Sequence, residues 1–189
     1  MNKSVYQTLI RMLHWIIVFS VVMAYSTAYY RYWYTTQTEV ANWYLLVVHI
    51  NFGLLIFILS IVMFTLYYRL STSKDSVAPV ITITTKATPA RIMHYALYFM
   101  LISLPVSAYL GTGFDIPVLG VFSLPGFFRF EFIEHTVQQN FDMLMITFIE
   151  PFANYHRDIA ADILFPLLLV GHIGAAIIHD KLKKVRPCC

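Results

Sequence analysis

YHRDIAADILFPLLLVGHIGAAIIHD, residues 155–180, is the stretch that decides the architecture of this chain. A long apolar run lies between His156 and His172, and His179 follows just past it. A histidine inside hydrocarbon is costly unless something binds it, so an ionisable residue in a membrane segment predicts a functional site. The stretch therefore predicts a membrane helix in which His156 and His172 each offer an imidazole to a buried cofactor.

The composition excludes a water-soluble globular protein. Of 189 residues, 59% are hydrophobic and only 12% are charged, whereas soluble domains carry about 25% charged residues. The length suits one compact domain covering residues 1–189. Both cysteines stand at the last two positions, so no disulfide framework is expected for the body of the fold. We expect contact with a lipid bilayer and no nucleic-acid partner.

Four apolar runs approach or exceed the roughly 20 residues that a helix needs to cross a bilayer. The expected helices cover about residues 9–30, 41–68, 92–110 and 159–179. The first run is longer than the core of a signal peptide and ends in an aromatic belt, so it is expected to be retained. The expected fold class is an all-α membrane four-helix bundle with cofactors in the bundle core.

The basic residues predict the orientation of the bundle. Ten of the 13 flank the termini and the connection between the second and third helices, where only two acids accompany them. The opposite face carries three basic residues, Arg31, Arg129 and Arg157, and eight acids. By the positive-inside rule both termini are expected to be cytoplasmic, in a bacterial inner membrane.

The outer connection between the third and fourth helices is long, from Gly111 to about Arg157. Glycines and prolines mark turns in its first half. Residues 127–152 mix aromatic and acidic side chains, a pattern that favours an amphipathic helix on the outer leaflet. The inner connection over residues 70–89 is rich in Ser and Thr and is expected to be a loop.

The histidines fall at two depths in the expected bundle. His14, His94 and His172 lie toward the inner side, whereas His49 and His156 lie toward the outer side. Facing helices of a bundle can hold a cofactor between inward side chains, so the arrangement predicts two bis-histidine haems stacked across the membrane. A helix–helix hydrogen bond is the ordinary role of a lone membrane histidine.

Several motifs carry a resemblance to the bacterial cytochrome b561 family over nearly the whole chain, in the family's order. They are Arg11-Met12-Leu13-His14-Trp15, Val48-His49-Ile50-Asn51-Phe52-Gly53, His94-Tyr95 with Leu104-Pro105-Val106-Ser107, Phe114 to Pro125, and Gly171-His172 to His179-Asp180. The resemblance implies that His14 and His172 ligate an inner haem b, and that His49 and His156 ligate an outer one. His94 is expected to bond locally or to touch a haem edge or quinone. His179 is expected at the membrane boundary, and His135 in the outer loop.

One spacing departs from the resembled family. Its fourth-helix ligands usually lie fourteen residues apart, whereas His156 and His172 are sixteen apart. At about 100° per residue, sixteen residues of straight α-helix place the two rings about 160° apart. A kink at Pro166 or a π-bulge would change this phase, or His156 lies just before the helix.

The leading function is a di-haem membrane cytochrome that exchanges electrons between a quinone and an outer-face partner. The resemblance adds superoxide oxidation coupled to ubiquinone reduction as one candidate. An electron-relay anchor subunit of a larger dehydrogenase is one alternative, and a non-redox transporter or scaffold is another. Arg31 and Arg157 are candidate partners of the haem propionates, or else topology signals or lipid contacts. A homodimer is compatible with the sequence.

Overall fold

Long helices build almost all of the structure, a computed structural model that describes residues 3–72 and 89–185. Three spans are single helices, α1 (Lys3–Tyr34), α2 (Val40–Thr72) and α3 (Pro89–Thr112). The fourth is a continuous rod of α5 (Met145–Asn154), the π-helix η2 (Tyr155–Leu164) and α6 (Phe165–Val185). All four are long and apolar enough to cross a bilayer. The expected all-α membrane four-helix bundle is confirmed.

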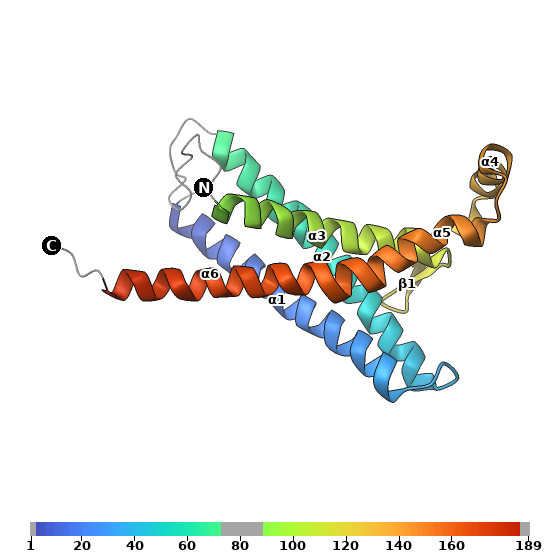
Figure 1. Cartoon of the computed structure of the whole chain (residues 1–189), viewed down its shortest axis with the longest axis horizontal. Helices are drawn as coiled ribbons and strands as arrows, with labels where there is room; N and C mark the ends of the chain where they lie inside the picture. The colour runs from blue at the N-terminus through green and yellow to red at the C-terminus, as the bar shows by residue number, and fades with distance from the viewer. Residues whose placement is uncertain (1–2, 73–88, 186–189) are drawn as a thin grey trace.

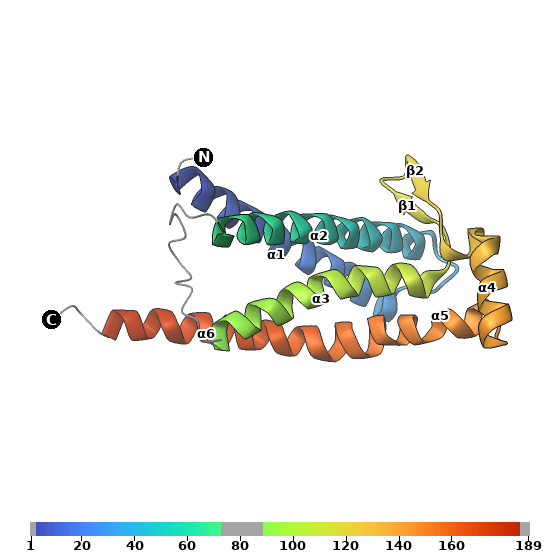
Figure 2. The ribbon, with the colours of Figure 1, turned by 90° about the horizontal axis from the view of Figure 1, so that it is seen from above.

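The four spans form two pairs that cross obliquely. The α1–α2 hairpin packs closely along its length and crosses the pair formed by α3 and α6 (Figure 1). We call the end that carries α4 and the β-hairpin the loop end, and the end where α1 begins and α6 finishes the terminal end. Seen from above, α3 lies between α2 and the α5–α6 rod (Figure 2).

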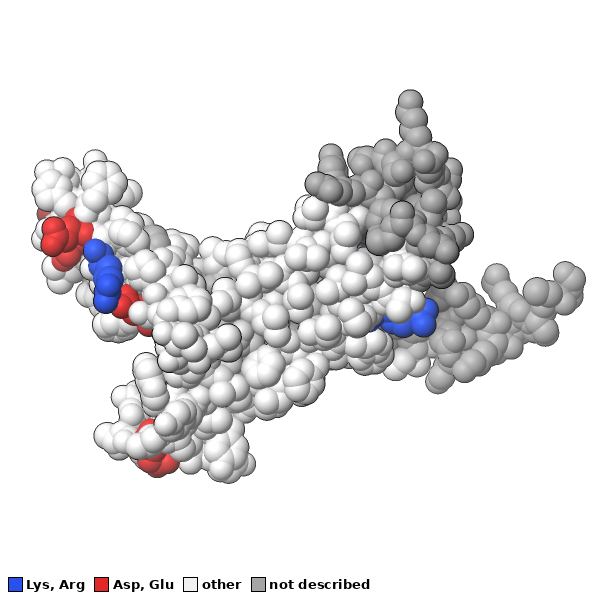
Figure 3. Space-filling model, turned by 180° about the vertical axis from the view of Figure 1, so that it is seen from behind, with Lys and Arg blue, Asp and Glu red and all other residues white. Residues whose placement is uncertain are grey.

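The bundle core is small, and most apolar side chains point outward. Ile17, Ile56, Met100 and Phe165 are buried at its centre, whereas large apolar residues elsewhere on the spans are widely exposed. On the face drawn in Figure 3, acidic side chains gather at the loop end with basic atoms among them, and an uncharged belt separates this end from the basic side chains near the terminal end. Such a belt suits the hydrocarbon region of a bilayer.

The sequence suggested that the fourth span begins near residue 159. In the structure it begins earlier, at Met145. Pro151 and the charged pair Arg157 and Asp158 suggest a helix boundary, yet the helix runs through them. Prolines are tolerated in membrane helices because neighbouring groups satisfy the freed carbonyls. The expected amphipathic helix over 127–152 is accordingly divided. Its first part is α4 (Glu131–Phe141), which lies across the bundle axis (Figure 2), and its last part joins the span as α5.

A small antiparallel hairpin, β1 (Ile116–Val118) and β2 (Phe122–Leu124), follows α3, and a short 3-10 turn, η1 (Phe127–Arg129), leads to α4. The turn between β1 and β2 uses Leu119 at φ 51° and Gly120 at φ 69°. A left-handed backbone is uncommon for leucine. Asn51 of α2 holds this turn, since its side chain accepts from the Leu119 amide at 2.8 Å and donates to the Pro117 carbonyl at 3.1 Å. The hairpin is thereby tied to α2 two residues from His49.

Most of the expected inner loop, residues 73–88, lies outside the described residues, as do the two C-terminal cysteines.

Candidate functional site

Two histidines face each other toward the terminal end. The rings of His14 in α1 and His172 in α6 have centroids 6.5 Å apart and planes inclined by 57°. A metal bonds an imidazole nitrogen at about 2.0 Å, so a metal held in line between two imidazoles places their ring centres roughly 6 Å apart. The separation of His14 and His172 therefore fits two imidazoles that would bind one metal ion between them.

A second pair stands toward the loop end. The rings of His49 in α2 and His156 in η2 have centroids 6.3 Å apart and planes inclined by 79°. His49 contacts the backbone of α1 at Ala24, ten residues beyond His14. Ten residues of α-helix span about 15 Å, so the two imidazole pairs lie at clearly separate depths.

Backbone carbonyls orient both rings of the loop-end pair. His49 Nδ1 donates to the Ala24 carbonyl and His156 Nδ1 donates to the Leu104 carbonyl, each at 2.9 Å. A carbonyl oxygen only accepts, so the proton resides on Nδ1 and Nε2 carries the lone pair. This is how metal-ligating histidines are ordinarily held, because the outer bond fixes both tautomer and ring orientation. These two carbonyls are site components without a side-chain signal in the sequence.

The π-helix resolves the sixteen-residue spacing. Half of the steps from His156 to His172 lie within η2, which ends at Leu164. A π-helix bonds each N–H to the carbonyl five residues back and turns by about 82° per residue. The combined rotation of eight π-helical and eight α-helical steps returns His172 to within about 20° of the face of His156. The two rings therefore reach partners on the same side of the rod, as the two ring pairs show.

The three remaining histidines belong to neither pair. The His94 ring in α3 packs edge-on against His172 with centroids 5.3 Å apart, closer than two ligands on opposite sides of a metal. His135 is exposed in α4, where it lies 3.4 Å from the Gln139 side-chain nitrogen. His179 falls in α6, and its side chain lies outside the described residues.

The two candidate propionate partners sit in different surroundings. Arg31 Nε donates to Asn42 at 2.8 Å, and Asn42 donates to Thr35, which ties the end of α1 to the start of α2. Arg157 is exposed and pairs with Asp158 beside it and with Asn154. The propionate role of both arginines stays a prediction.

Open space accompanies the loop-end pair. Gly53 follows His49 by four residues and so shares its helix face. A Cβ atom at Gly53 would meet no protein atom within 4 Å, although the residue is only partly exposed. In addition, neither α1 nor α2 packs its backbone extensively against α6 in the described residues. Paired imidazoles, outer hydrogen bonds and open space between helices fit a macrocycle.

The family model for prokaryotic cytochrome b561 matches residues 5–186, nearly the whole chain. The chain belongs to the prokaryotic cytochrome b561 family. No curated protein and no solved structure matches it at a significant level. Family membership makes this protein a multi-pass membrane b-type cytochrome of electron transfer, and b-type haem is the cofactor that its histidine pairs fit.

Beside the loop-end pair, this cytochrome has a shallow groove of about 400 Å³ between α3 and the α5–η2 segment. Apolar side chains form most of its wall, and hydroxyl groups of Ser103 and Tyr155 lie 3.2 Å apart in it. These two residues directly precede Leu104 and His156, which share the hydrogen bond that orients the His156 ring. The groove and the loop-end histidine pair thus adjoin.

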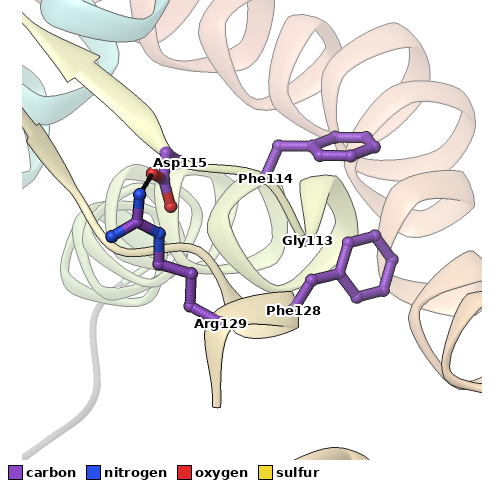
Figure 4. A pocket seen from close by; sticks show the side chains of 5 residues that line it. All are labelled: Gly113, Phe114, Asp115, Phe128 and Arg129. Carbon is purple, nitrogen blue, oxygen red and sulfur yellow. Dashed lines mark ion pairs between the residues drawn. The ribbon is translucent and has the colours of Figure 1, made fainter. Parts of the chain in front are cut away.

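A second hollow of about 420 Å³ lies in the loop region, lined by Gly113, Phe114, Asp115, Phe128 and Arg129. Figure 4 shows the Arg129 guanidinium turned toward Asp115, and their ion pair measures 2.9 Å. Asp115 also accepts from the Gly126 amide at 2.9 Å. The charged side chains that line this hollow thus pair with each other, and none of its lining residues is a histidine.

Proposed function

We propose that this cytochrome binds two haem b groups and exchanges electrons between a quinone in the membrane and a partner at the loop end, which faces the periplasm. His14 and His172 would hold one haem, and His49 and His156 the other. The observation that carries the proposal is the presence of two facing histidine pairs, whose ring centroids are 6.5 and 6.3 Å apart.

The ligand count favours haem over a bare metal ion. Protein sites for bare zinc use at least three side chains, whereas each couple here offers two imidazoles. Among the described residues, no group of three or more His, Cys, Asp or Glu side chains is placed to hold a metal ion. Haem iron with two protein ligands supplies reversible one-electron transfer without an open coordination position.

The chain's own residues have definite tasks in this proposal. The Ala24 and Leu104 carbonyls accept from Nδ1 of His49 and His156, which leaves Nε2 of each ring as the atom that would bind haem iron. Gly53 leaves room beside His49. Arg31, placed by Asn42 at the loop end of α1, would pair with a propionate, and so would Arg157 if it exchanged Asp158 for that partner.

The groove between α3 and η2 is our candidate quinone site. The Ser103 hydroxyl can donate to the Met100 carbonyl at 3.5 Å or to Tyr155 at 3.2 Å. When it donates to Tyr155, the Tyr155 hydroxyl keeps its own proton for a ligand carbonyl. The exposed Phe99 and Val106 give the groove an apolar rim toward lipid, which suits a ring with an isoprenoid tail. Small-molecule sites commonly combine apolar walls with a few such polar groups.

The periplasmic partner is defined so far only by charge. In the sequence, the loop end carries eight acids against three arginines, which favours a cationic donor or acceptor over an anion. Superoxide remains a candidate donor if Arg31 and Arg157 attract it locally. An electron-relay role beneath a larger dehydrogenase uses the same haems, with the loop-end surface as the docking site.

Haem stoichiometry tests the proposal directly. Protein purified from haem-supplemented membranes should be red, with a reducible b-type spectrum and two haems per chain by pyridine haemochrome assay. A folded, colourless protein would exclude the redox function and favour a transporter or scaffold. Superoxide-dependent quinone reduction by the lone chain would then separate an independent oxidoreductase from an anchor subunit.

A further inference from the structure

Pro166 creates an unsatisfied carbonyl in the middle of the fourth span. In a π-helix, the carbonyl of Ala161 would accept from residue 166, which is a proline and has no N–H. The α-helical donor, the Phe165 amide, bonds instead to Ala160. The rod therefore offers Ala161 neither partner, and an unpaired backbone carbonyl at membrane depth costs free energy.

Another helix supplies the missing donor. The Tyr25 hydroxyl of α1 donates to the Ala161 carbonyl at 2.7 Å. The Tyr25 ring also stacks on Phe165, with centroids 6.1 Å apart and planes inclined by 18°. Tyr25 thus contacts both sides of the point where the π-helix gives way to α6.

We propose that Tyr25 is a positioning residue that keeps residues 155–164 in the π conformation and thereby holds His156 and His172 on one face. Without the Tyr25 hydroxyl, the π conformation leaves the Ala161 carbonyl without a donor. In an α-helix the Phe165 amide reaches Ala161, and Pro166 deprives the Asp162 carbonyl instead, so the π conformation loses its advantage and the segment shifts toward α-helix. That change removes the phase correction and swings His156 away from His49. The consequence for haem rests on the proposed function, whereas the conformational claim does not.

Hydrogen–deuterium exchange of the full-length protein tests the conformational claim without relying on haem. In Tyr25→Phe, amides of residues 155–170 should exchange about tenfold faster than in the wild-type protein, as expected for loss of one buried hydrogen bond. Tyr29→Phe is the matched control, since Tyr29 lies one turn further along α1 and its hydroxyl donates to the exposed Asp162 side chain at 3.0 Å rather than to a backbone carbonyl. Equal exchange in Tyr25→Phe and Tyr29→Phe would overturn the proposal.

Pro166→Ala provides the second arm. It restores an N–H at residue 166 that can bond to Ala161, so Tyr25→Phe should have little further effect in that background. The double variant should exchange within about twofold of Pro166→Ala alone. An undiminished effect of Tyr25→Phe in the double variant would show that the hydroxyl does not act through Ala161.

Haem readouts complete the experiment. In Tyr25→Phe the low-spin electron paramagnetic resonance signal of one haem should shift, or haem content should fall from two per chain toward one, with recovery in the double variant. If the wild-type protein bound no haem, the proposed function would fail while the exchange measurement still decided the role of Tyr25. Altered exchange with both haem signals unchanged would refute the link between the π-helix and ligand alignment.

Discussion

His156 donates its Nδ1 proton to the carbonyl oxygen of Leu104 over 2.9 Å, so a ring on the fourth span is oriented by the third. His49 is held in the same way by the backbone of α1. Each ring of the loop-end pair is therefore fixed from a helix other than its own. Such outer hydrogen bonds hold metal ligands ready in the geometry that the metal requires.

Double histidine replacements should report the pairing. His49→Ala and His156→Ala should each lose one haem, and the double variant should still keep the other, because both residues serve the same site. His49→Ala combined with His172→Ala should lose both haems, because it damages both sites. Haem content per chain and the reduced-minus-oxidised spectrum give the measurement. Two haems retained in His156→Ala would show that the His49–His156 pair is not a ligand pair.

Gly53 tests whether the open space beside His49 belongs to a macrocycle. Gly53→Leu should remove the loop-end haem, since the new side chain would enter the space that the porphyrin needs. Gly174→Leu is the control, because its Cβ also meets no protein atom within 4 Å, but residues two apart do not share a helix face and Gly174 therefore points away from the His172 side. Equal haem contents in both variants would mean that Gly53 faces only lipid.

Part of the fold and of the histidine site could be predicted from the sequence, and part could not. The four spans and the two depths of the histidines follow from long apolar runs and from the positions of single polar residues within them. The phase of His156 does not follow, because a kink at Pro166, a π-bulge and a late helix start all remained open in the sequence, and the π-helix bonds to Tyr25 of α1, which is far away in the chain. Likewise, α5 continues through Pro151, where local propensity favours a boundary. The ring-orienting carbonyls of Ala24 and Leu104 have no side-chain signature.

Asn51 should prove important for the loop end without being a ligand. Asn51→Ala removes both bonds that hold the β-hairpin turn, at Leu119 and Pro117, and the left-handed backbone of Leu119 loses its support. We expect a cost of about 1–3 kcal/mol, seen as a lower melting temperature and faster proteolysis between residues 113 and 126. Asn140→Ala should leave both unchanged, because Asn140 is exposed in α4 and its side chain donates to the Thr136 carbonyl of the same helix.

Tyr155→Phe should weaken quinone use while leaving haem content at two per chain. Loss of the hydroxyl removes one hydrogen bond to the ligand, so the KM for a short-chain ubiquinone should rise about three- to tenfold with a smaller change in kcat. Tyr109→Phe is the comparison variant, since Tyr109 lies on α3 outside the groove and donates to Pro125. An unchanged KM in Tyr155→Phe would place the quinone elsewhere on the bundle.

The acidic loop end makes the salt dependence of electron transfer a test of the partner's charge. Raising the ionic strength from about 0.01 to 0.15 M shortens the Debye length from about 30 to 8 Å. The reduction rate by a cationic donor should therefore fall with salt, because screening removes attraction to the eight acids. The rate with superoxide should rise slightly, because screening removes repulsion. A superoxide rate that falls steeply with salt would instead indicate a local basic funnel, and Arg31→Gln and Arg157→Gln should then flatten that dependence.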